Sequence, residues 1–327
     1  MDNKNVSAPS GKIEQTWRTL LSPVTDDLAP VRDPTRANMV DLDPKFLDYL
    51  RWAFSRHLTF HECRRAYWFD YVATYDREVD SLLKNRIWKL RDLTSKRFLA
   101  GSLVHNAIAE FLSNLSKGRE MTENELHDHL LQNIERYRRT ARDTLAEYFN
   151  GLALEQTYFD RVRTEGTEQL SMFLRVMWPP LSRLGYTQHE KPERFEIDDI
   201  PVTVKIDLVS KSPDGRIFVI DWKTGGDDER YQSDLQIGVY ALWAAWKFGV
   251  DPATVVTDLY YLRSGKTVSK HLTSEDFDRI RQTVATEYQE FTTATSKDEN
   301  PANPAPDRCL GCKFATVCEA ADLTGAR

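Results

Sequence analysis

Long hydrophobic runs are absent from this sequence. Nowhere do its 327 residues reach about 20 consecutive apolar residues, the length that a membrane-spanning helix needs. Residues 1–5 also lack the apolar segment of a secretory signal. We therefore expect a soluble, cytoplasmic protein with no membrane partner.

Cysteine is scarce as well. A chain of this length with only four cysteines cannot depend on a disulfide scaffold, and the cytoplasm keeps thiols reduced. The four are Cys63, Cys309, Cys312 and Cys318. They are better interpreted as metal ligands or as buried thiols.

Excess positive charge is also missing, because 44 Lys and Arg residues face 50 Asp and Glu residues, for a net charge of −6. This balance argues against a protein that coats nucleic acid, although it leaves room for a local basic groove. The Gly-x-x-x-x-Gly-Lys-Ser/Thr motif of ATP-driven motors is absent, so any helicase would be a separate partner. With 41% hydrophobic and 29% charged residues, the composition is that of a globular protein with a sizeable core.

Four segments are predicted along the chain. Residues 1–50 form an irregular extension with a short helical candidate at 12–21, and residues 51–185 form a helical region. Residues 186–295 form the core, whose strands alternate with helices. Residues 296–327 combine a stiff proline-containing linker with three of the four cysteines.

The helical region is expected to contain about three to five helices between residues 58 and 184. Thr59 and Glu62 have the spacing of a capping box, which predicts a helix over 59–71 with Cys63 in its first or second turn. A second helix is predicted to begin near Gly101. Its apolar stripe places His105 at the stripe's edge, where a histidine by itself is more often a packed residue than a metal ligand. The stripe consists of Val104, Ile108, Phe111, Leu112 and Leu115.

The core is predicted to be of the α/β class, with a mixed sheet flanked by helices. Apolar residues alternate over 202–208, and the turn residues 212–215 separate this strand from a returning strand over 216–222. A helix over 233–248, a hairpin over 255–272 and a helix over 273–291 follow.

The first hairpin brings two carboxylates together. Its turn places Asp207 opposite Asp221 or Trp222, with the Cβ atoms of the two aspartates roughly 5 Å apart. Like charges this close require a proton or a cation between them, and Mg²⁺ or Mn²⁺ prefers oxygen ligands. Lys223 projects from the same strand face as Asp221 and could orient or deprotonate a water molecule. The alternative is an ordinary Asp–Lys pair on a solvated hairpin face.

These residues resemble the PD-(D/E)xK nuclease superfamily, particularly its RecB-like branch. The resemblance covers about residues 55–325. Four of that branch's motifs occur in the expected order: Gly-x-x-x-His at Gly101–His105, Ile206-Asp207, Asp-x-Lys-Thr-Gly at Asp221–Gly225, and Gln-x-x-x-Tyr at Gln236–Tyr240. A restriction-endonuclease-like core is the fold that the resemblance implies.

The resemblance also implies a role for each residue. His105, Asp207, Asp221 and the backbone carbonyl of Trp222 would bind Mg²⁺ or Mn²⁺. Lys223 would activate water, while Gln236 and Tyr240 would position the scissile phosphate or brace the lysine. Glu193 matches a Glu-x-Phe segment that often precedes the first core strand, without an assigned role.

The cysteine pattern is asymmetric, because Cys63 precedes Cys309 by 246 positions whereas the other three cysteines lie within ten residues. Thiolates in this number suit zinc or an iron–sulfur cluster, and the spacing does not decide between them or exclude four unrelated buried thiols. The arrangement resembles the iron–sulfur members of the RecB-like branch, the nuclease subunits of AddAB-type recombination helicases and the CRISPR-associated exonucleases. This resemblance implies that Cys63, Cys309, Cys312 and Cys318 bind a 4Fe–4S cluster, with zinc as the less favoured occupant.

The expected function is thus a metal-dependent DNA nuclease, an exonuclease or end-processing enzyme in repair, recombination or mobile-element defence. Arg64 and Arg65 would contact DNA, and the aromatic residues Tyr67, Trp68 and Trp222 could stack on unpaired bases. A basic group on residues 136–142 is a second DNA-contact candidate, or simply a solvated face. Because no base-reading motif is present, we expect single-stranded DNA or ends to be bound without sequence specificity. The alternatives are a catalytically silent DNA-binding subunit of a helicase–nuclease complex and a zinc-stapled structural protein.

Overall fold

The fold is that of a computed structural model, which describes residues 42–43, 45–226 and 234–324. The helical candidate at 12–21 lies outside the described residues. The described residues all belong to one compact unit.

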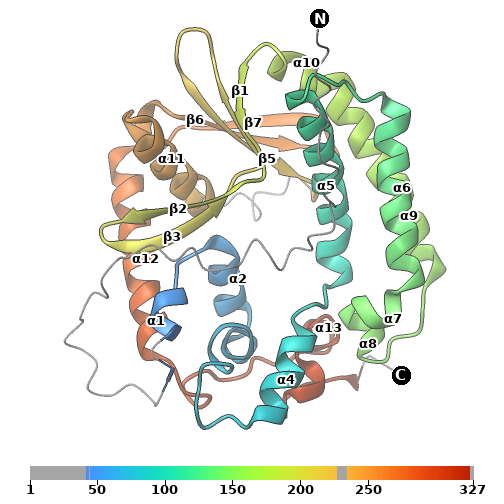
Figure 1. The fold of residues 1–327 in the computed structure, drawn as a ribbon, viewed down its shortest axis with the longest axis vertical. Coiled ribbons are helices and arrows are strands. Elements are labelled where there is room, and N and C mark those ends of the chain that lie inside the picture. Colours follow the sequence, from blue (N-terminus) through green and yellow to red (C-terminus); the bar gives the residue numbers. More distant parts are fainter. Residues whose placement is uncertain (1–41, 44, 227–233, 325–327) are drawn as a thin grey trace, which may run out of the picture. The chain divides into compact units, whose positions relative to one another are not determined.

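A five-stranded mixed sheet lies at the centre of the core (Figure 1). Its strand order is β1-β4-β5-β6-β7, and within this sheet β5 and β6 are the one pair of neighbouring strands that is parallel. The predicted 255–272 hairpin is confirmed, since β6 and β7 pair antiparallel and extend the same sheet. The strands are β1 (Gly185–Gln188), β4 (Leu208–Lys211), β5 (Ile217–Lys223), β6 (Val256–Tyr261) and β7 (Lys266–Lys270).

The strand predicted over residues 202–208 is wrong as a single strand, because the structure divides it. Its first part belongs to β3 (Ile200–Lys205), which pairs with β2 (Pro192–Ile197) in a separate two-stranded sheet. Its second part begins β4 after a break at residues 206–207. The alternation is nonetheless real, since Val202, Val204, Ile206 and Leu208 are all buried. Asp207 therefore lies where the chain passes from one sheet to the other.

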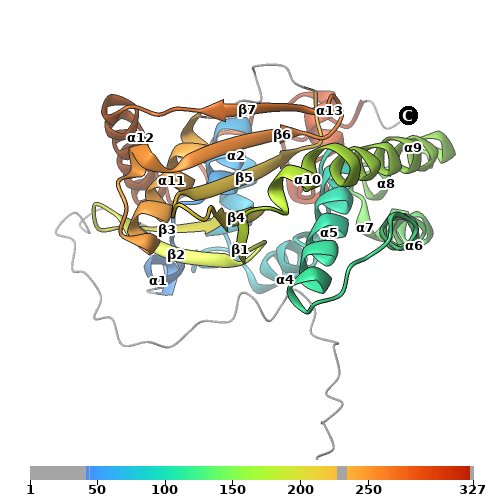
Figure 2. The same ribbon diagram turned by 90° about the horizontal axis from the view of Figure 1, so that it is seen from above.

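Helices lie on opposite sides of the five strands (Figures 1 and 2). On β5, Ile220 and Trp222 belong to the apolar cluster formed with α5 (Lys96–Ser116), whereas Val219 belongs to the cluster formed with α11 (Asp234–Phe248). This alternation follows from the two-residue period of a strand. The α11 cluster also includes α12 (Ser274–Thr293), whose capping box of Thr273 and Asp276 confirms the predicted start.

The helical region is more fragmented than predicted. Four of its helices have ten or more residues, but short helices and two π-helical turns separate them. The long ones are α4 (Ser81–Leu90), α5, α6 (Glu123–Arg139) and α9 (Gln156–Met172). The short elements are α1 (Lys45–Tyr49), α2 (Phe54–Glu62), α3 (Arg64–Tyr67), α7 (Ala141–Thr144), α8 (Ala146–Phe149), α10 (Trp178–Leu181) and the π-helices Trp68–Val72 and Phe173–Met177.

The predicted helix over 59–71 is wrong at both its start and its continuity. Thr59 lies inside α2, and its hydroxyl donates to the carbonyl of Ser55 rather than capping a helix. The helix then breaks at Cys63, whose backbone is extended with φ −160° and ψ 108°. Residues on both sides of the break form hydrogen bonds with the C-terminal segment. The Arg65 amide donates to the Pro301 carbonyl, and the Asn303 side chain donates to the Glu62 carbonyl. The second predicted helix, α5, begins before Gly101, after the N-cap Ser95.

The C-terminal segment returns to the first helices of the chain. It contains α13 (Pro306–Leu310) and a 3₁₀ turn at Ala315–Val317, so Pro306 begins a helix instead of extending the predicted linker. Phe314 is buried and stacks on Phe69 with ring centroids 5.5 Å apart. Asn150, directly after α8, donates to the carbonyls of Leu310 and Cys312 at 2.9 Å. Among the described helices, none has both the length and the apolarity needed to cross a membrane.

Candidate functional site

The hairpin of β4 and β5 sets the geometry of the candidate site. Its register pairs Leu208 with Ile220, which continues to Asp207 opposite Asp221, as the turn predicts. Both aspartates are buried, with exposed fractions of 7% and 4%. The Trp222 amide donates to Asp207 Oδ2 at 2.8 Å. Because the N–H and C=O of a strand residue point to the same side, the Trp222 carbonyl also faces Asp207.

Helix α5 brings His105 to Asp207 across the sheet edge. The His105 Nδ1 atom lies 3.2 Å from Asp207 Oδ1 and 3.8 Å from Glu190 Oε1. Burial alone would lower the pKa of His105, but the nearby carboxylates outweigh burial and raise it to about 10. Burial raises the pKa of Asp207 to about 6, with His105 opposing and Asp221 adding to the shift. An imidazole and carboxylates are thus held close together, away from bulk water.

Glu190 is a site residue that the sequence reasoning missed. It lies between β1 and β2 with a left-handed φ of 48°, and its amide donates to the Ile206 carbonyl at 2.8 Å. Its carboxylate forms an ion pair with Lys205. The structure does not bring Glu193 to this site, because the Glu193 carboxylate lies 2.8 Å from Lys191 Nζ and 3.2 Å from Lys247 Nζ. No motif in the sequence marks Glu190.

Lys223 is fixed by Asp221 and α11. Its Nζ atom lies 2.6 Å from Asp221 Oδ2 and donates to Gln236 Oε1 at 3.0 Å. The Gln236 amide nitrogen donates to Asp221 Oδ1 at 3.2 Å and to the Tyr240 hydroxyl at 3.0 Å. Tyr240 in turn donates to the Lys205 carbonyl at 3.1 Å. Gln236 and Tyr240, one helical turn apart, therefore brace the lysine and the aspartate.

The donor set fits a hard divalent metal ion. The ligand atoms of His105, Glu190 and Asp207 all lie within 4.8 Å of one another. Asp221 Oδ2 is buried and forms an ion pair with Lys223 but has no hydrogen-bond partner among the described residues. A cation next to these carboxylates would relieve their mutual repulsion.

Comparison with known families agrees with this geometry. A family model described as the PD-(D/E)XK nuclease superfamily matches residues 51–319. The chain belongs to this superfamily. The match extends from α2 through both sheets and includes all four cysteines.

Individual relatives are distant. The Gene 69 protein of Mycobacterium phage D29 is 27% identical over 169 residues, which are 50% of this chain and 61% of the phage protein. The chain thus spans less than two thirds of that relative's length. A crystal structure of a presumed exonuclease from Eubacterium rectale is 14% identical with a TM-score of 0.37, over 74% of this chain and 85% of that one.

Gly101, the first residue of the nuclease-like helix motif, packs directly against the strand motif. A Cβ atom at this position would lie 2.8 Å from Thr224 Oγ1, closer than real Cβ contacts permit. The Thr224 carbonyl also accepts a hydrogen bond from Gln169 of α9 at 3.1 Å. Glycine at 101 therefore allows the close approach of α5 that places His105, one turn later, beside Asp207.

The four cysteines form a second candidate site, to which the start of α3 contributes Cys63 and the C-terminal segment contributes the other three. Burial raises the pKa of Cys312 to about 12, and the neighbouring thiols of Cys63, Cys318 and Cys309 add to this shift. All four are free thiols. The electrostatic influence of these thiols on one another makes them neighbours, and neighbouring thiols without disulfides have the chemistry to bind a metal ion or an iron–sulfur cluster.

Arg64 and Arg65 connect α3 to α12 and to the C-terminal segment. The Arg65 guanidinium is buried, donates to the carbonyls of Asn300 and Lys297, and pairs with Glu319. Arg64 is half-exposed and pairs with Glu290 of α12. These contacts give both arginines intramolecular partners, and only Arg64 retains accessible surface of any size.

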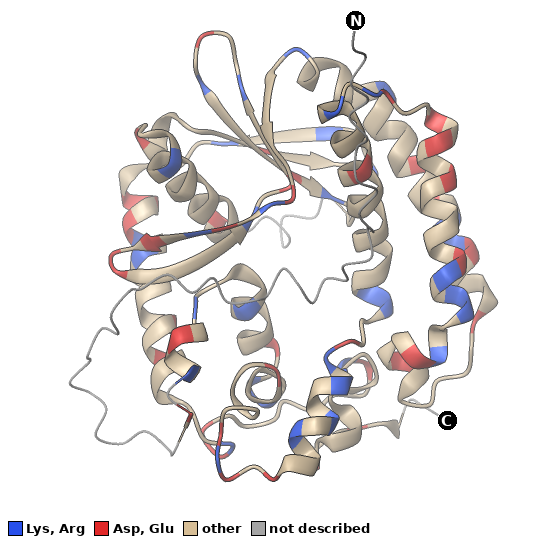
Figure 3. Cartoon of the chain, viewed as in Figure 1, with Lys and Arg blue, Asp and Glu red and all other residues tan. Residues whose placement is uncertain are grey.

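The aromatic residues proposed for base stacking are unsuitable. Tyr67, Trp68 and Trp222 are exposed by 2% or less, so the expectation that they stack on unpaired bases is wrong. They fill the core instead; the Trp222 ring, for example, packs edge-on against Phe173. The basic group at the end of α6 remains on the surface (Figure 3), where Arg138 pairs with Glu135.

Proposed function

We propose that this protein is a metal-dependent nuclease that hydrolyses phosphodiester bonds in DNA, acting on single strands or ends without sequence specificity. The observation that supports this most is the bracing of Lys223 by Asp221 and Gln236 next to the His105–Asp207–Glu190 group. A purely structural pair would not need this many buried polar groups at one sheet edge.

Each residue of the candidate site has a proposed role in hydrolysis. His105, Asp207, Asp221 and the Trp222 carbonyl would hold Mg²⁺ or Mn²⁺, with Glu190 as a further carboxylate. The bound metal ion supplies charge stabilisation for the phosphate oxygens and lowers the pKa of water. Lys223, fixed through Gln236 and Tyr240, orients the attacking water and accepts or relays its proton.

Cleavage assays with a matched lysine control test this proposal. Purified protein is incubated with single-stranded DNA and end-labelled duplex, with Mg²⁺, Mn²⁺ or EDTA. We expect metal-dependent products from the wild type and from Lys211→Ala, which changes an exposed lysine on the same hairpin. Lys223→Ala should lose roughly 10²–10⁴-fold in rate.

Two outcomes would contradict the proposal in different ways. If no substrate yields metal-dependent products, the chain is better described as a silent DNA-binding subunit or a structural protein. If Lys223→Ala cuts as fast as Lys211→Ala, the activity is real but belongs to other residues.

We further propose that Cys63, Cys309, Cys312 and Cys318 bind a 4Fe–4S cluster, which ties α2 and α3 to the C-terminal segment. Ligation of such a group contributes directly to folding free energy. Iron and acid-labile sulfide are measured in protein purified without oxygen. Colourless protein with zinc and no iron would reject the cluster and leave the zinc-stapled alternative.

A further inference from the structure

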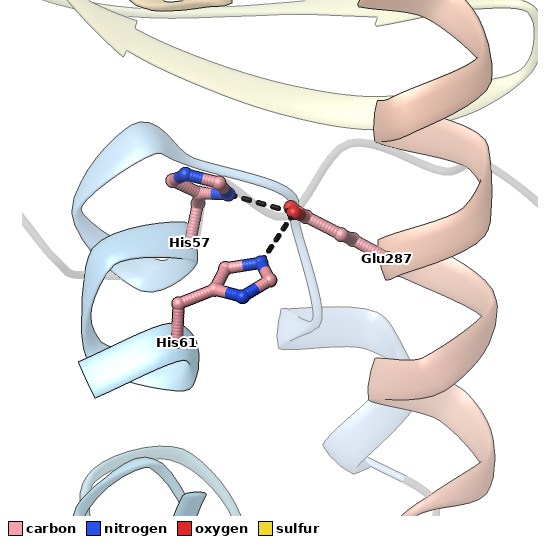
Figure 4. Close-up of side chains that lie close together, drawn as sticks. All are labelled: His57, His61 and Glu287. Carbon is pink, nitrogen blue, oxygen red and sulfur yellow. Dashed lines mark hydrogen bonds and ion pairs between the residues drawn. The ribbon is translucent and has the colours of Figure 1, made fainter. Parts of the chain in front are cut away.

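A second group of metal-binding side chains lies outside the candidate nuclease site (Figure 4). His57 and His61 are one turn apart on α2, and Glu287 faces them from α12. His57 Nδ1 and His61 Nε2 each lie 2.7 Å from the same atom, Glu287 Oε1. Residues separated by 226 or more positions in the sequence thus converge on one point.

The Glu287 carboxylate is held in place as an anion. It is buried, and its second oxygen accepts a hydrogen bond from Trp52 Nε1 at 2.8 Å. Burial would raise the pKa of Glu287, but the hydrogen bonds from His57, His61 and Trp52 outweigh burial and lower it. Hydrogen bonds from outside the ligand group orient carboxylates at metal sites in the same way.

Two imidazoles and one carboxylate are a ligand set typical of zinc with an open fourth position. The His61 side chain is 57% exposed, which leaves access for a water molecule to complete the tetrahedron. Ligand atoms around tetrahedral zinc lie about 3.3 Å apart. Both imidazole nitrogens would therefore withdraw from Glu287 Oε1 by about 0.6 Å, and the exposed His61 ring has solvent into which it can move.

We propose that His57, His61 and Glu287 bind a zinc ion that joins α2 to α12, independently of the nuclease site. The alternative is an ion-free clamp in which both imidazoles donate to the carboxylate. The metal is favoured because the three ligand atoms all lie within 4.8 Å of one another, close enough for one ion to contact each, and Trp52 already satisfies the second carboxylate oxygen.

Zinc binding is tested in a His105→Ala background, which removes a ligand of the candidate nuclease site. Full-length protein is treated with EDTA, its iron content is confirmed unchanged, and Zn²⁺ is titrated by calorimetry and by thermal unfolding. His61→Ala should lose one zinc equivalent and the zinc-dependent rise in Tm. His271→Ala, at an exposed histidine, should retain both.

His61→Glu separates the metal site from the clamp. Glutamate reaches about as far as the Nε2 atom of histidine, so the new carboxylate can approach Glu287. This variant should have a lowered Tm without zinc and recover it with zinc, because a carboxylate is itself a zinc ligand. Equal zinc binding and Tm shifts in His61→Ala and its parent would overturn the proposal. So would a His61→Glu variant whose Tm stays low at all zinc concentrations, which is the result that an ion-free clamp gives.

Discussion

The candidate nuclease site and the cysteine site gather their side chains in opposite ways. Asp207, Asp221, Lys223, Gln236 and Tyr240 lie within 34 consecutive residues and meet through one hairpin and the helix after it. The cysteine site instead requires Cys63 to meet residues at least 246 positions away. Local pairing therefore builds most of the first site, to which α5 adds His105 from 102 positions away, whereas the second depends on the whole described chain being folded.

The two sites also differ in what they do without metal. At the nuclease site, opposite charges satisfy one another, since His105 faces Asp207 and Lys223 faces Asp221. At the cysteine site, burial keeps the pKa of Cys312 at about 12, so its thiol stays neutral unless a metal displaces the proton. We infer that metal loss would silence the first site but unfold the surroundings of the second.

The largest expected effect is at the cysteine site. Cys312→Ala should remove a ligand and cost more than about 4 kcal/mol of folding free energy, because metal loss is among the most destabilising changes. Soluble yield and chemical denaturation measure this. Thr316→Ala, an exposed change in the same segment, should leave both unchanged. Full stability in Cys312→Ala would mean that the four thiols are merely buried.

Asp221→Asn should show the opposite pattern. Removing one anionic ligand should slow metal-dependent cleavage by roughly 10²–10⁴-fold, equivalent to several kcal/mol of transition-state stabilisation. Thermal unfolding should change less than in Cys312→Ala, because the lost ion pair with Lys223 is partly offset by relief of the repulsion between Asp221 and Asp207. Asp214→Asn, in the turn of the same hairpin, serves as the control. If Asp221→Asn fails to fold, the nuclease site is also needed for stability, and the proposed difference from the cysteine site is wrong.

Arg65 and Arg64 test whether the segment after Cys63 binds DNA or supports the fold. Arg65→Ala should destabilise the protein by about 2–3 kcal/mol, since it leaves the carbonyls of Asn300 and Lys297 without their donor. Arg64→Ala removes a half-exposed ion pair and should cost less than about 1 kcal/mol. Denaturation and DNA binding are measured together. If Arg65→Ala is as stable as the wild type but binds DNA more weakly, Arg65 contacts DNA directly.

Gly101→Ala should disturb the approach of α5 to β5. The added methyl group meets Thr224 Oγ1, so we expect a loss of about 1–3 kcal/mol and slower cleavage as His105 shifts. Adding Thr224→Ala should restore part of both. A double mutant no better than Gly101→Ala would show that the contact is not the cause.

The last prediction concerns metal affinity as pH changes, an effect that is small for each tenth of a pH unit but accumulates over the titration. Because the pKa of His105 is raised to about 10 in the metal-free site, metal must displace its proton at neutral pH. Affinity should therefore rise about tenfold per pH unit from pH 7 towards 10, and more steeply below the Asp207 pKa of about 6, where a second proton is displaced. Calorimetry in buffers of different ionisation enthalpy counts the released protons. A pH-independent affinity would contradict the assignment of His105 as a ligand.

The contrast between the sites explains what could be predicted from the sequence. The register of Asp207 and Asp221 follows from strand alternation and turn length, both of which are local. The break at Cys63 could not be predicted, because Thr59 and Glu62 suit a helix start and only contacts from residues 300–303 show otherwise. Glu190 escaped notice because a left-handed loop residue belongs to no periodic pattern.

The zinc site proposed between α2 and α12 could not be predicted from the sequence either, because its residues are far apart along the chain. Histidines four residues apart are common on helix surfaces, and nothing in the sequence connects them to a glutamate on α12. Pairs of this kind become visible only when long-range packing is known. Short-range patterns thus predicted most of the side-chain proximity between β4 and α11 and little of what joins the two ends of the chain.

The return of the C-terminal segment to α3 and α8 has a consequence for the order of events on the ribosome. Every residue of the candidate nuclease site has been synthesised by Tyr240, whereas the Asn150 and Arg65 side chains must wait for residues 297–319. At about 5–20 residues per second, the 255 positions between Cys63 and Cys318 take roughly 13–50 s to translate. In the last part of this interval, between the synthesis of Tyr240 and that of Cys309, the nascent chain would have a complete hairpin with its carboxylates in register, while its first cysteine would still lack all three partners.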